Sequence, residues 1–191
     1  MKYIKLLLVL LPIYSQSQTL MIENGNYVTT QNYNPYLWVW ANSTIDSSNF
    51  KINCFSLINP KNNWAEIFVG PSYTHTYKTG MCEFGVFPGF ETDKRPIRFM
   101  GYLFHKQNIG KGALKNFFDF EYGGSGYWYV WYSQYQTKQG FIFGFQGQSF
   151  NGVWGPKIGY TKSFFTAYLV SGYNLEKKEY GFNLGLRATL F

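Results

Sequence analysis

Cysteine, histidine and charged residues are all scarce in this chain. It has two cysteines and two histidines, and Asp, Glu, Lys and Arg together make up 14% of its residues. Neither Cys54 nor Cys82 has the paired spacing of a metal site. Beyond the N-terminal segment, no apolar run reaches the roughly 20 residues that a transmembrane helix needs. The sequence therefore predicts no metal ion, no cofactor and no membrane-spanning helix in the mature chain.

The N-terminal segment has the three regions of a secretory signal peptide. Two lysines precede the apolar run Leu6–Tyr14, and the small and polar residues 15–17 follow it. The run is too short to cross a bilayer, and no cysteine follows it to carry a lipid anchor. We therefore predict that residues 1–17 are a signal peptide and that residues 18–191 form one exported domain, because no linker composition divides them.

The mature chain has the composition and the periodicity of β-strands. Aromatic residues make up 22% of the sequence and glycine occurs 20 times, which is typical of strands that twist and pack rings on a pleated surface. Between Trp64 and Thr74, apolar side chains such as Ile67 and Val69 alternate with Glu66 and Ser72. This period of two is typical of strands with one face toward lipid and the other toward a lumen.

Eleven segments show this pattern, and bacterial barrels have an even number of strands. Counting Leu20–Thr29 as a further strand gives 12, whereas removing one hairpin gives 10. In lipid, a closed barrel is the strand structure that pairs every backbone polar group. The predicted fold is therefore all-β, a single antiparallel up-and-down transmembrane β-barrel of 10–12 strands with meander topology, and we favour 12. The eleven segments are Tyr33–Asn42, Phe50–Ile58, Trp64–Thr74, Cys82–Glu91, Ile97–His105, Asn116–Tyr122, Tyr127–Tyr135, Phe141–Gln148, Trp154–Thr161, Phe164–Tyr173 and Tyr180–Phe191.

The last segment ends in Gly185–Phe191, an amphipathic stretch closing on a terminal Phe. With the signal peptide and the repeated strands, it resembles the small outer-membrane β-barrel proteins of Gram-negative bacteria. The resemblance implies an outer-membrane location, contact with outer-membrane lipid and lipopolysaccharide, and recognition of Phe191 by the barrel-insertion machinery. One feature departs from that class, because the apolar face carries Leu190, Leu186 and Leu184 rather than the positions in phase with Phe191. A bulge near the end of the chain is one way to restore the phase.

Charged side chains share the glycine-containing, inward face of several strands. Charges inside a barrel must be paired or hydrated. In a narrow barrel they form a salt-bridged plug, and in one of about 12 strands they line a narrow pore or a solute pocket. We favour a plugged or ligand-holding interior, because Trp64, Phe68 and Phe87 also point inward. The candidate lumen residues are Glu66, Glu83, Glu91, Arg98, Asp119, Glu121, Lys157 and Arg187.

Tryptophan and cysteine allow more than one interpretation. The six tryptophans suit a carbohydrate or aromatic-solute site, but an interfacial aromatic belt explains them more simply. An exported chain permits a disulfide. Cys54 and Cys82, however, fall on lipid-facing positions of strands separated by a third, about 10 Å apart at a strand spacing near 4.8 Å. This separation favours two small buried apolar residues over a bridge.

Three function classes remain open. The preferred one is an outer-membrane barrel of structural, solute-binding or narrow-pore type. The second is an outer-leaflet, lipid A-type modifying enzyme, for which Ser72 and a loop residue, His75, are a conceivable pair at the outer face. The third is a soluble periplasmic ligand-binding barrel. Because no catalytic signature is visible, we predict that the protein is not an enzyme. The net charge of +7 does not indicate nucleic-acid binding in an exported chain.

Overall fold

The computed structural model describes residues 19–29, 32–45, 48–92, 97–149 and 152–190. The predicted signal peptide and Phe191 lie outside these residues and stay predictions. Among the described residues, no helix is long and apolar enough to cross a membrane.

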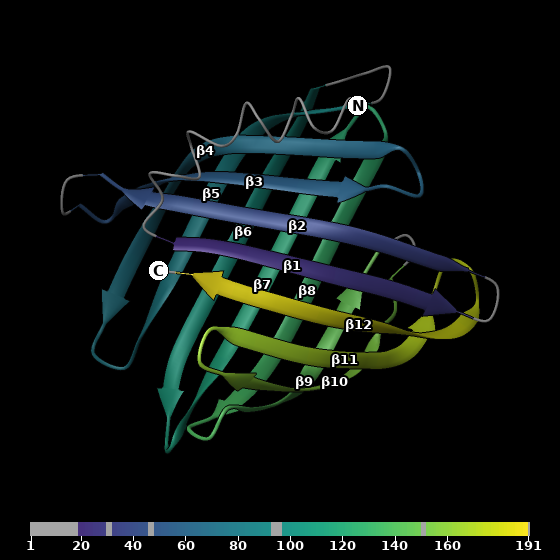
Figure 1. Ribbon diagram of the computed structural model, residues 1–191. Helices are drawn as coiled ribbons and strands as arrows, with labels where there is room; N and C mark the ends of the chain where they lie inside the picture. The colour runs from purple at the N-terminus through teal and green to yellow at the C-terminus, as the bar shows by residue number, and fades with distance from the viewer. Residues whose placement is uncertain (1–18, 30–31, 46–47, 93–96, 150–151, 191) are drawn as a thin grey trace.

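Twelve strands form one closed antiparallel sheet (Figure 1). Each strand pairs with its neighbours in sequence, and β1 pairs with β12 to close the barrel. The all-β, up-and-down meander is confirmed with the favoured number of strands, because the segment from Leu20 does contribute a strand. The strands are β1 (Thr19–Thr29), β2 (Tyr33–Thr44), β3 (Phe50–Asn59), β4 (Trp64–Tyr77), β5 (Gly80–Glu91), β6 (Ile97–Ile109), β7 (Gly112–Gly123), β8 (Gly126–Thr137), β9 (Phe141–Gln148), β10 (Gly155–Lys162), β11 (Phe165–Asn174) and β12 (Glu179–Leu190).

The two ends of the barrel differ in their connections. At one end, here called the terminal end, lie the start of β1, the end of β12 and tight turns such as those between β4 and β5 and between β6 and β7. The opposite, far end carries the connection between β9 and β10, which is longer. Bacterial barrels have short turns on the periplasmic side, so this asymmetry matches a periplasmic terminal end.

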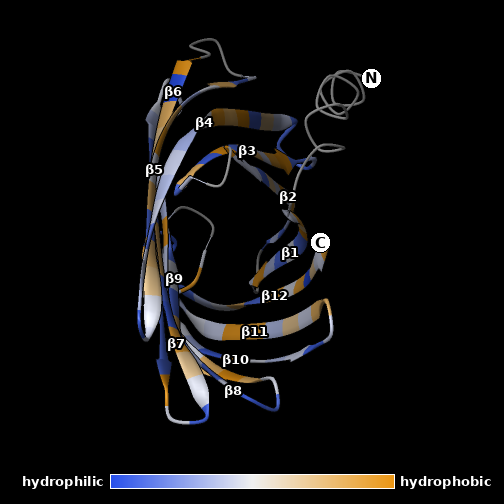
Figure 2. Cartoon of the chain, turned by 90° about the vertical axis from the view of Figure 1, so that its left-hand side faces the viewer, coloured by the Kyte–Doolittle hydropathy of each residue, from blue (hydrophilic) through white to orange (hydrophobic). Residues whose placement is uncertain are grey.

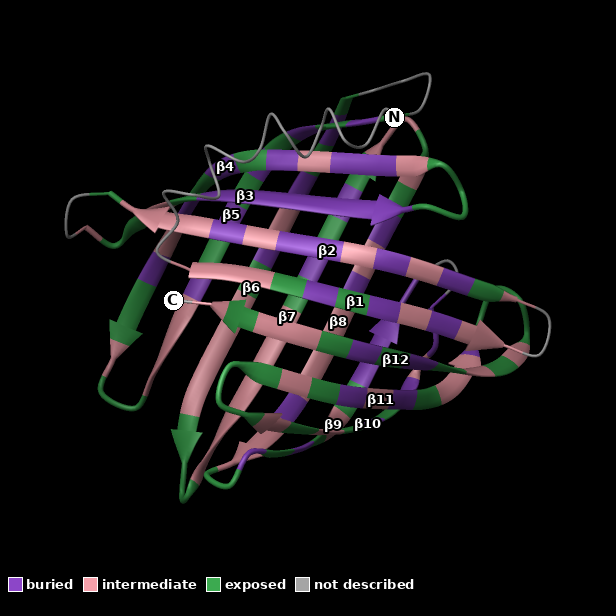
Figure 3. Cartoon of the chain, in the orientation of Figure 1, coloured by how far each residue is buried: buried purple, intermediate pink, exposed green. Residues whose placement is uncertain are grey.

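The outer surface of the barrel is apolar. On β5, β6 and β9, most of the outward-facing positions carry large exposed hydrophobes, and Val86 and Phe90 are 65% and 63% exposed. Figures 2 and 3 show the same alternation as bands of hydropathy and of burial along the strands. A continuous apolar surface of this kind is unfavourable in water. It fits the lipid-facing side of a membrane barrel and argues against the soluble alternative.

Rings from β2 cross the interior and meet the opposite wall. The ring centroids of Trp38 and Trp128 lie 5.6 Å apart, and those of Trp40 and Tyr102 lie 4.9 Å apart. Trp40 also lies 6.4 Å from Phe117 of β7. Figure 1 shows β2 in front, running across β6, β7 and β8 behind it. Aromatic side chains therefore cross the middle of the lumen and narrow it.

The interfacial-belt interpretation of the tryptophans is wrong for most of them. Trp38 and Trp128 are buried inside the barrel, and Trp40 and Trp64 pack against the same interior cluster. Trp131 lies outside, on the ring of the exposed Phe145. The phase of the strand decides the side: Tyr33, at the start of β2, is 52% exposed and has the opposite phase to Trp38 and Trp40, which therefore point inward.

The final strand keeps its register to the end of the described chain. Pairing of β12 with β1 runs without interruption from Gly181 to Leu190, so no bulge restores the phase within these residues. Leu184 and Leu186 are exposed on the outer face, as the alternation predicted.

Cys54 on β3 and Cys82 on β5 are separated by β4, which is the expected separation of the two cysteines.

Candidate functional site: the charged lumen and its mouth

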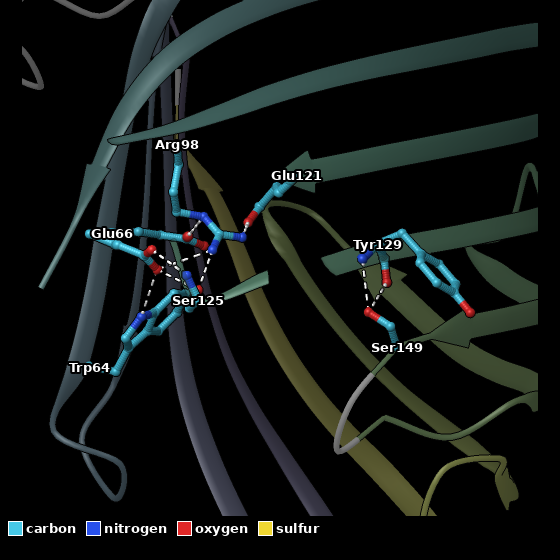
Figure 4. A network of polar contacts seen from close by, with 8 residues as sticks. Trp64, Glu66, Arg98, Glu121, Ser125, Tyr129 and Ser149 are labelled. Atoms are coloured by element: carbon cyan, nitrogen blue, oxygen red, sulfur yellow. Dashed lines mark hydrogen bonds and ion pairs between the residues drawn. The ribbon is translucent and has the colours of Figure 1, made fainter. Parts of the chain in front are cut away.

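Arg98 of β6 holds three carboxylates in the lumen near the far end (Figure 4). Its Nε lies 2.9 Å from Glu66 Oε2. Its Nη1 and Nη2 each lie 3.0 Å from a carboxylate oxygen, on Glu91 and Glu121 respectively. These acids come from β4, β5 and β7, so the guanidinium joins four neighbouring strands. Arg98 is 1% exposed, and we call these four residues the Arg98 cluster.

The turn between β7 and β8 completes the Arg98 cluster. The backbone N–H of Ser125 donates to Glu91 Oε1 at 2.9 Å, and its hydroxyl donates to Glu91 Oε2 at 2.6 Å. Trp64 Nε1 donates to the same carboxylate at 3.1 Å. A buried ion pair is stabilising only when such hydrogen bonds satisfy the remaining lone pairs. Ser125 was not among the residues predicted from the sequence, because the carboxylate that it contacts is remote in sequence.

Glycine lies beside Arg98 on both neighbouring strands. Gly89 of β5 and Gly123 of β7 are its direct neighbours in register. A Cβ on Gly123 would lie 2.2 Å from Arg98 Cγ, and one on Gly89 would lie 2.4 Å from the Ile67 carbonyl oxygen. Glycine at position 123 is therefore a condition for the Arg98 cluster, whereas glycine at position 89 leaves room for the Phe68 ring and the backbone of β4.

We expect Gly89→Ala to lower the free energy of unfolding by about 1–3 kcal/mol, the usual cost of overpacking. The matched control is Gly101→Ala, because an added Cβ there meets its first neighbour, a carbonyl oxygen, at 3.9 Å. Urea unfolding of both variants in lipid vesicles, followed by tryptophan fluorescence, measures the difference. Equal midpoints for the two variants would contradict the steric argument.

Glu83 of β5 is the centre of a second network. Lys51 Nζ lies 2.6 Å from Glu83 Oε2, and the hydroxyls of Ser72, Thr74 and Tyr102 also donate to this carboxylate. Asn53 extends the network: its Nδ2 donates to Ser72 Oγ at 2.7 Å, and its Oδ1 accepts from the Trp40 indole at 3.0 Å. The indole of Trp40, which lies in the middle of the lumen, is thus held by a series of hydrogen bonds that runs from Glu83 through Ser72 and Asn53.

A third network joins the closing strands. Glu23 of β1 accepts hydrogen bonds from Arg187 of β12, at 2.6 Å from Nε, and from the Tyr168 hydroxyl of β11. Lys157 of β10 lies close by, with its Nζ 4.1 Å from the Tyr168 ring centroid and 4.6 Å from that of Tyr132. Such ring faces attract a cation.

The structure places all eight predicted lumen residues inside the barrel and sorts them into different environments. Four form the Arg98 cluster, whereas Glu83, Lys157 and Arg187 belong to the two other networks. Asp119 stands apart: it is fully buried, and neither of its carboxylate oxygens has a hydrogen-bond partner among the described residues. Lys51 and Glu23 were missed as partners, although the inward phase of their strands was a usable signal.

A cavity of about 470 Å³ lies at the far end, above the ring contact of Trp38 and Trp128. Its wall combines aromatic rings with amide side chains, and Arg98 is the one charged residue among the described residues that line it. This volume lies within the ~300–1,000 Å³ of small-molecule sites. The ring residues of the wall are Tyr27, Tyr36, Trp38, Trp64 and Trp128.

The conceivable catalytic pair does not form. Ser72 points into the lumen, where it bonds to Glu83, whereas His75 is exposed three residues later on the other face of β4. The placement of His75 in a loop was also wrong, because His75 lies within β4; His105 lies within β6, near the same, terminal end. In the described part of the chain, no three His, Cys, Asp or Glu side chains are placed to hold a metal ion.

Comparison with known proteins finds likeness in structure and not in sequence. No family model matches the chain, and no curated protein matches it by sequence. Among solved structures, a KdgM porin superposes with a TM-score of 0.60 at 11% identity, covering 90% of this chain and 99% of that one. A NanC porin superposes with a TM-score of 0.53 at 12% identity, covering 90% and 98%. This chain therefore has the barrel fold of these two porins.

Proposed function

We propose that this protein is an outer-membrane β-barrel that takes small solutes into a narrow lumen. The observation that carries the proposal is the sidedness of the closed sheet. Large hydrophobes cover its outside, whereas the buried carboxylates, Arg98 and Lys157 face inward. Only a closed barrel leaves no unpaired strand edge in lipid. Contact with lipid and lipopolysaccharide, and insertion through the C-terminal strand, follow from this location.

The lumen suits a narrow pathway better than a wide pore. Two of the structural neighbours are porins by name. Here, however, Trp38 and Trp40 reach the opposite wall and narrow the middle of the lumen. Hydrophobic constrictions of this kind restrict passage of water and ions. The proposed function is therefore a solute channel with an aromatic constriction, which admits small solutes to the far-end cavity.

The two alternatives have less support. An outer-leaflet enzyme needs a nucleophile beside a base, and Ser72 and His75 lie on opposite faces of β4. Both also lie toward the terminal end, away from the outer leaflet in the proposed orientation. A soluble barrel needs a polar exterior, which the exposed hydrophobes of β5 and β9 do not provide.

Membrane fractionation tests the proposal. We expect the expressed chain to sediment with the outer membrane and to migrate differently in SDS with and without boiling, because a folded membrane barrel resists SDS. In planar bilayers, the purified protein should give small and rarely open conductance steps, since rings occupy its constriction. Recovery in the soluble periplasm without a mobility shift would refute the membrane location. A large, steadily open conductance would refute the constriction.

A further inference from the structure

We infer that the Arg98 cluster and the neighbouring Asp119 form a proton-binding site inside the lumen. At neutral pH, Glu66 and Glu121 share one proton and Asp119 carries a second. Release of these protons at higher pH adds two negative charges to the lumen wall. Three observations carry the inference: the way in which two acids bind the guanidinium, the burial of Asp119, and the ratio of acids to cations.

Glu66 and Glu121 bind the same edge of the Arg98 guanidinium. Glu66 Oε2 lies 2.9 Å from Nε, and Glu121 Oε2 lies 3.0 Å from Nη2 (Figure 4). These two nitrogens form the side of the guanidinium fork that can take both oxygens of one carboxylate. Two carboxyl groups therefore occupy a place that fits one, and this brings them close to each other.

The carboxyl groups of Glu66 and Glu121 lie within hydrogen-bonding reach of each other. Both side chains are 1% exposed or less. Counted as ionised groups, Glu66 Oε1 and Glu121 Oε1 have no donor among the described residues. An ionised carboxylate only accepts, so a hydrogen bond between the two needs a proton on one of them. A shared proton turns the repulsion of two close carboxylates into a hydrogen bond.

Asp119 lies fully buried beside this pair. It is two residues from Glu121 on the same, inward face of β7, and it is 0% exposed. Neither of its oxygens meets a donor in the described part of the chain. Its register neighbours are Val130 and Tyr102, and the Tyr102 hydroxyl donates to Glu83 instead. A buried carboxylate without donors is very costly, whereas the protonated form is neutral.

These acids outnumber the cations around them. Four carboxyl groups pack near the single guanidinium of Arg98, and Lys51 is already paired with Glu83. Four ionised carboxylates against one cation would bury a large uncompensated charge, whereas two protons leave only two negative charges against one positive charge. The groups that face the pair and Asp119 from the surrounding strands are Glu91 (β5), Arg98 and Tyr102 (β6), and the non-titratable Trp38 (β2), Leu57 (β3), Trp128 and Val130 (β8).

Proton binding of this kind makes the stability of the barrel depend on pH. Free carboxyl groups ionise near about pH 4, so at neutral pH the native barrel holds protons that the unfolded chain has released. Stability therefore falls as the pH rises. We expect the folding equilibrium constant to fall about tenfold per pH unit for each proton held, from about pH 5 upward, until the acids ionise in the barrel.

Infrared spectroscopy of the purified barrel, refolded in lipid vesicles, tests the inference. The C=O stretch of a protonated carboxyl group is resolved from the amide and carboxylate bands. We expect this band at about pH 7, where exposed Asp and Glu are ionised, and its loss in alkaline solution. Urea unfolding in the same vesicles, at about pH 5.5 and about pH 7.5, measures the fall in stability.

Three variants locate the protons. Asp119→Asn and Glu121→Gln replace an acid by a neutral group of similar shape. Each should remove part of the carboxyl band and retain the SDS mobility shift, and the double variant should lose most of the pH dependence of folding. Glu83→Gln is the matched control, because Glu83 is also a buried lumen acid but has Lys51 and three hydroxyl donors. Its carboxyl band should equal that of the wild type.

The inference is overturned if the wild type shows no carboxyl band at neutral pH, which would mean that water or a monovalent cation holds ionised acids. It is also overturned if the band is the same in Asp119→Asn and Glu121→Gln as in the wild type. If a variant does not insert, the pH dependence of the wild-type band decides. These readouts do not depend on conduction, so a barrel that shows the band but never conducts keeps the proton site and loses the channel.

Discussion

Arg98→Leu is expected to lower the free energy of unfolding by about 3–5 kcal/mol, the cost of leaving buried charges without their partner. The substitution removes the guanidinium that Glu66, Glu91 and Glu121 share, and all three carboxylates remain inside the barrel. Unfolding by urea in lipid vesicles, followed by tryptophan fluorescence, measures the change. Loss of the SDS mobility shift is a second readout if the variant does not insert.

A matched variant and a compensating one make this result specific. Lys51→Leu also removes a cation from a lumen carboxylate, but Glu83 keeps its hydroxyl donors Ser72, Thr74 and Tyr102. Its expected cost is about 1 kcal/mol, because the lysine side chain is partly exposed. Changing the three glutamates to glutamine in the Arg98→Leu background should recover part of the loss. If Arg98→Leu and Lys51→Leu lower the free energy of unfolding by the same amount, the three carboxylates do not depend on Arg98 as proposed.

Trp40→Ala is expected to raise the single-channel conductance severalfold. Its ring contacts Tyr102, Phe87 and Phe117 across the lumen, so its removal opens a path through the aromatic constriction. The strand ladder around the lumen does not depend on this side chain. Truncating a fully buried large ring costs about 3–5 kcal/mol, and Trp40 is partly buried, so recordings should be made at low temperature on protein that still shows the SDS mobility shift.

The control for this experiment is Trp131→Ala, which removes a ring of the same size from the outer surface. Its conductance should equal that of the wild type. Trp40→Leu, with a smaller side chain that retains apolar contacts, should give an intermediate value. If Trp40→Ala conducts no better than the wild type, the lumen is closed elsewhere, and Trp40 has a structural role alone.

The sequence predicted which side of the barrel wall each residue faces better than it predicted the contacts inside the lumen. Alternation within each strand placed Glu66, Arg98 and Lys157 on the inner face, and the structure has them there. Period-two patterns report which side a residue faces, because that depends on its own strand. They do not report which partner it meets across a lumen. Hence the contact of Trp38 with Trp128, six strands along the sheet, was not predictable from either segment.

The same limit explains the errors at the site. Assigning the tryptophans to a belt relied on composition, and composition does not report which face of β2 carries Trp38 and Trp40. Ser125 was missed, because nothing in its local sequence shows that Glu91 lies within reach of its backbone. Pairing of Arg98 with its acids depends on the register of four strands. The turns between the strands set this register, and the alternation within each strand does not determine it alone.

Closure of the sheet sets the order in which this protein can assemble. Every other strand pair joins neighbours in sequence, but the seam brings Leu20 beside Leu190. Contacts between the two ends of a chain pay the largest loop-closure entropy, so they form late. Until then β1 and β12 present open edges that are prone to pair with other chains. Glu23 and Arg187 lie on opposite sides of this seam. Their ion pair therefore forms only when β12 pairs with β1, and it then stabilises the closed barrel.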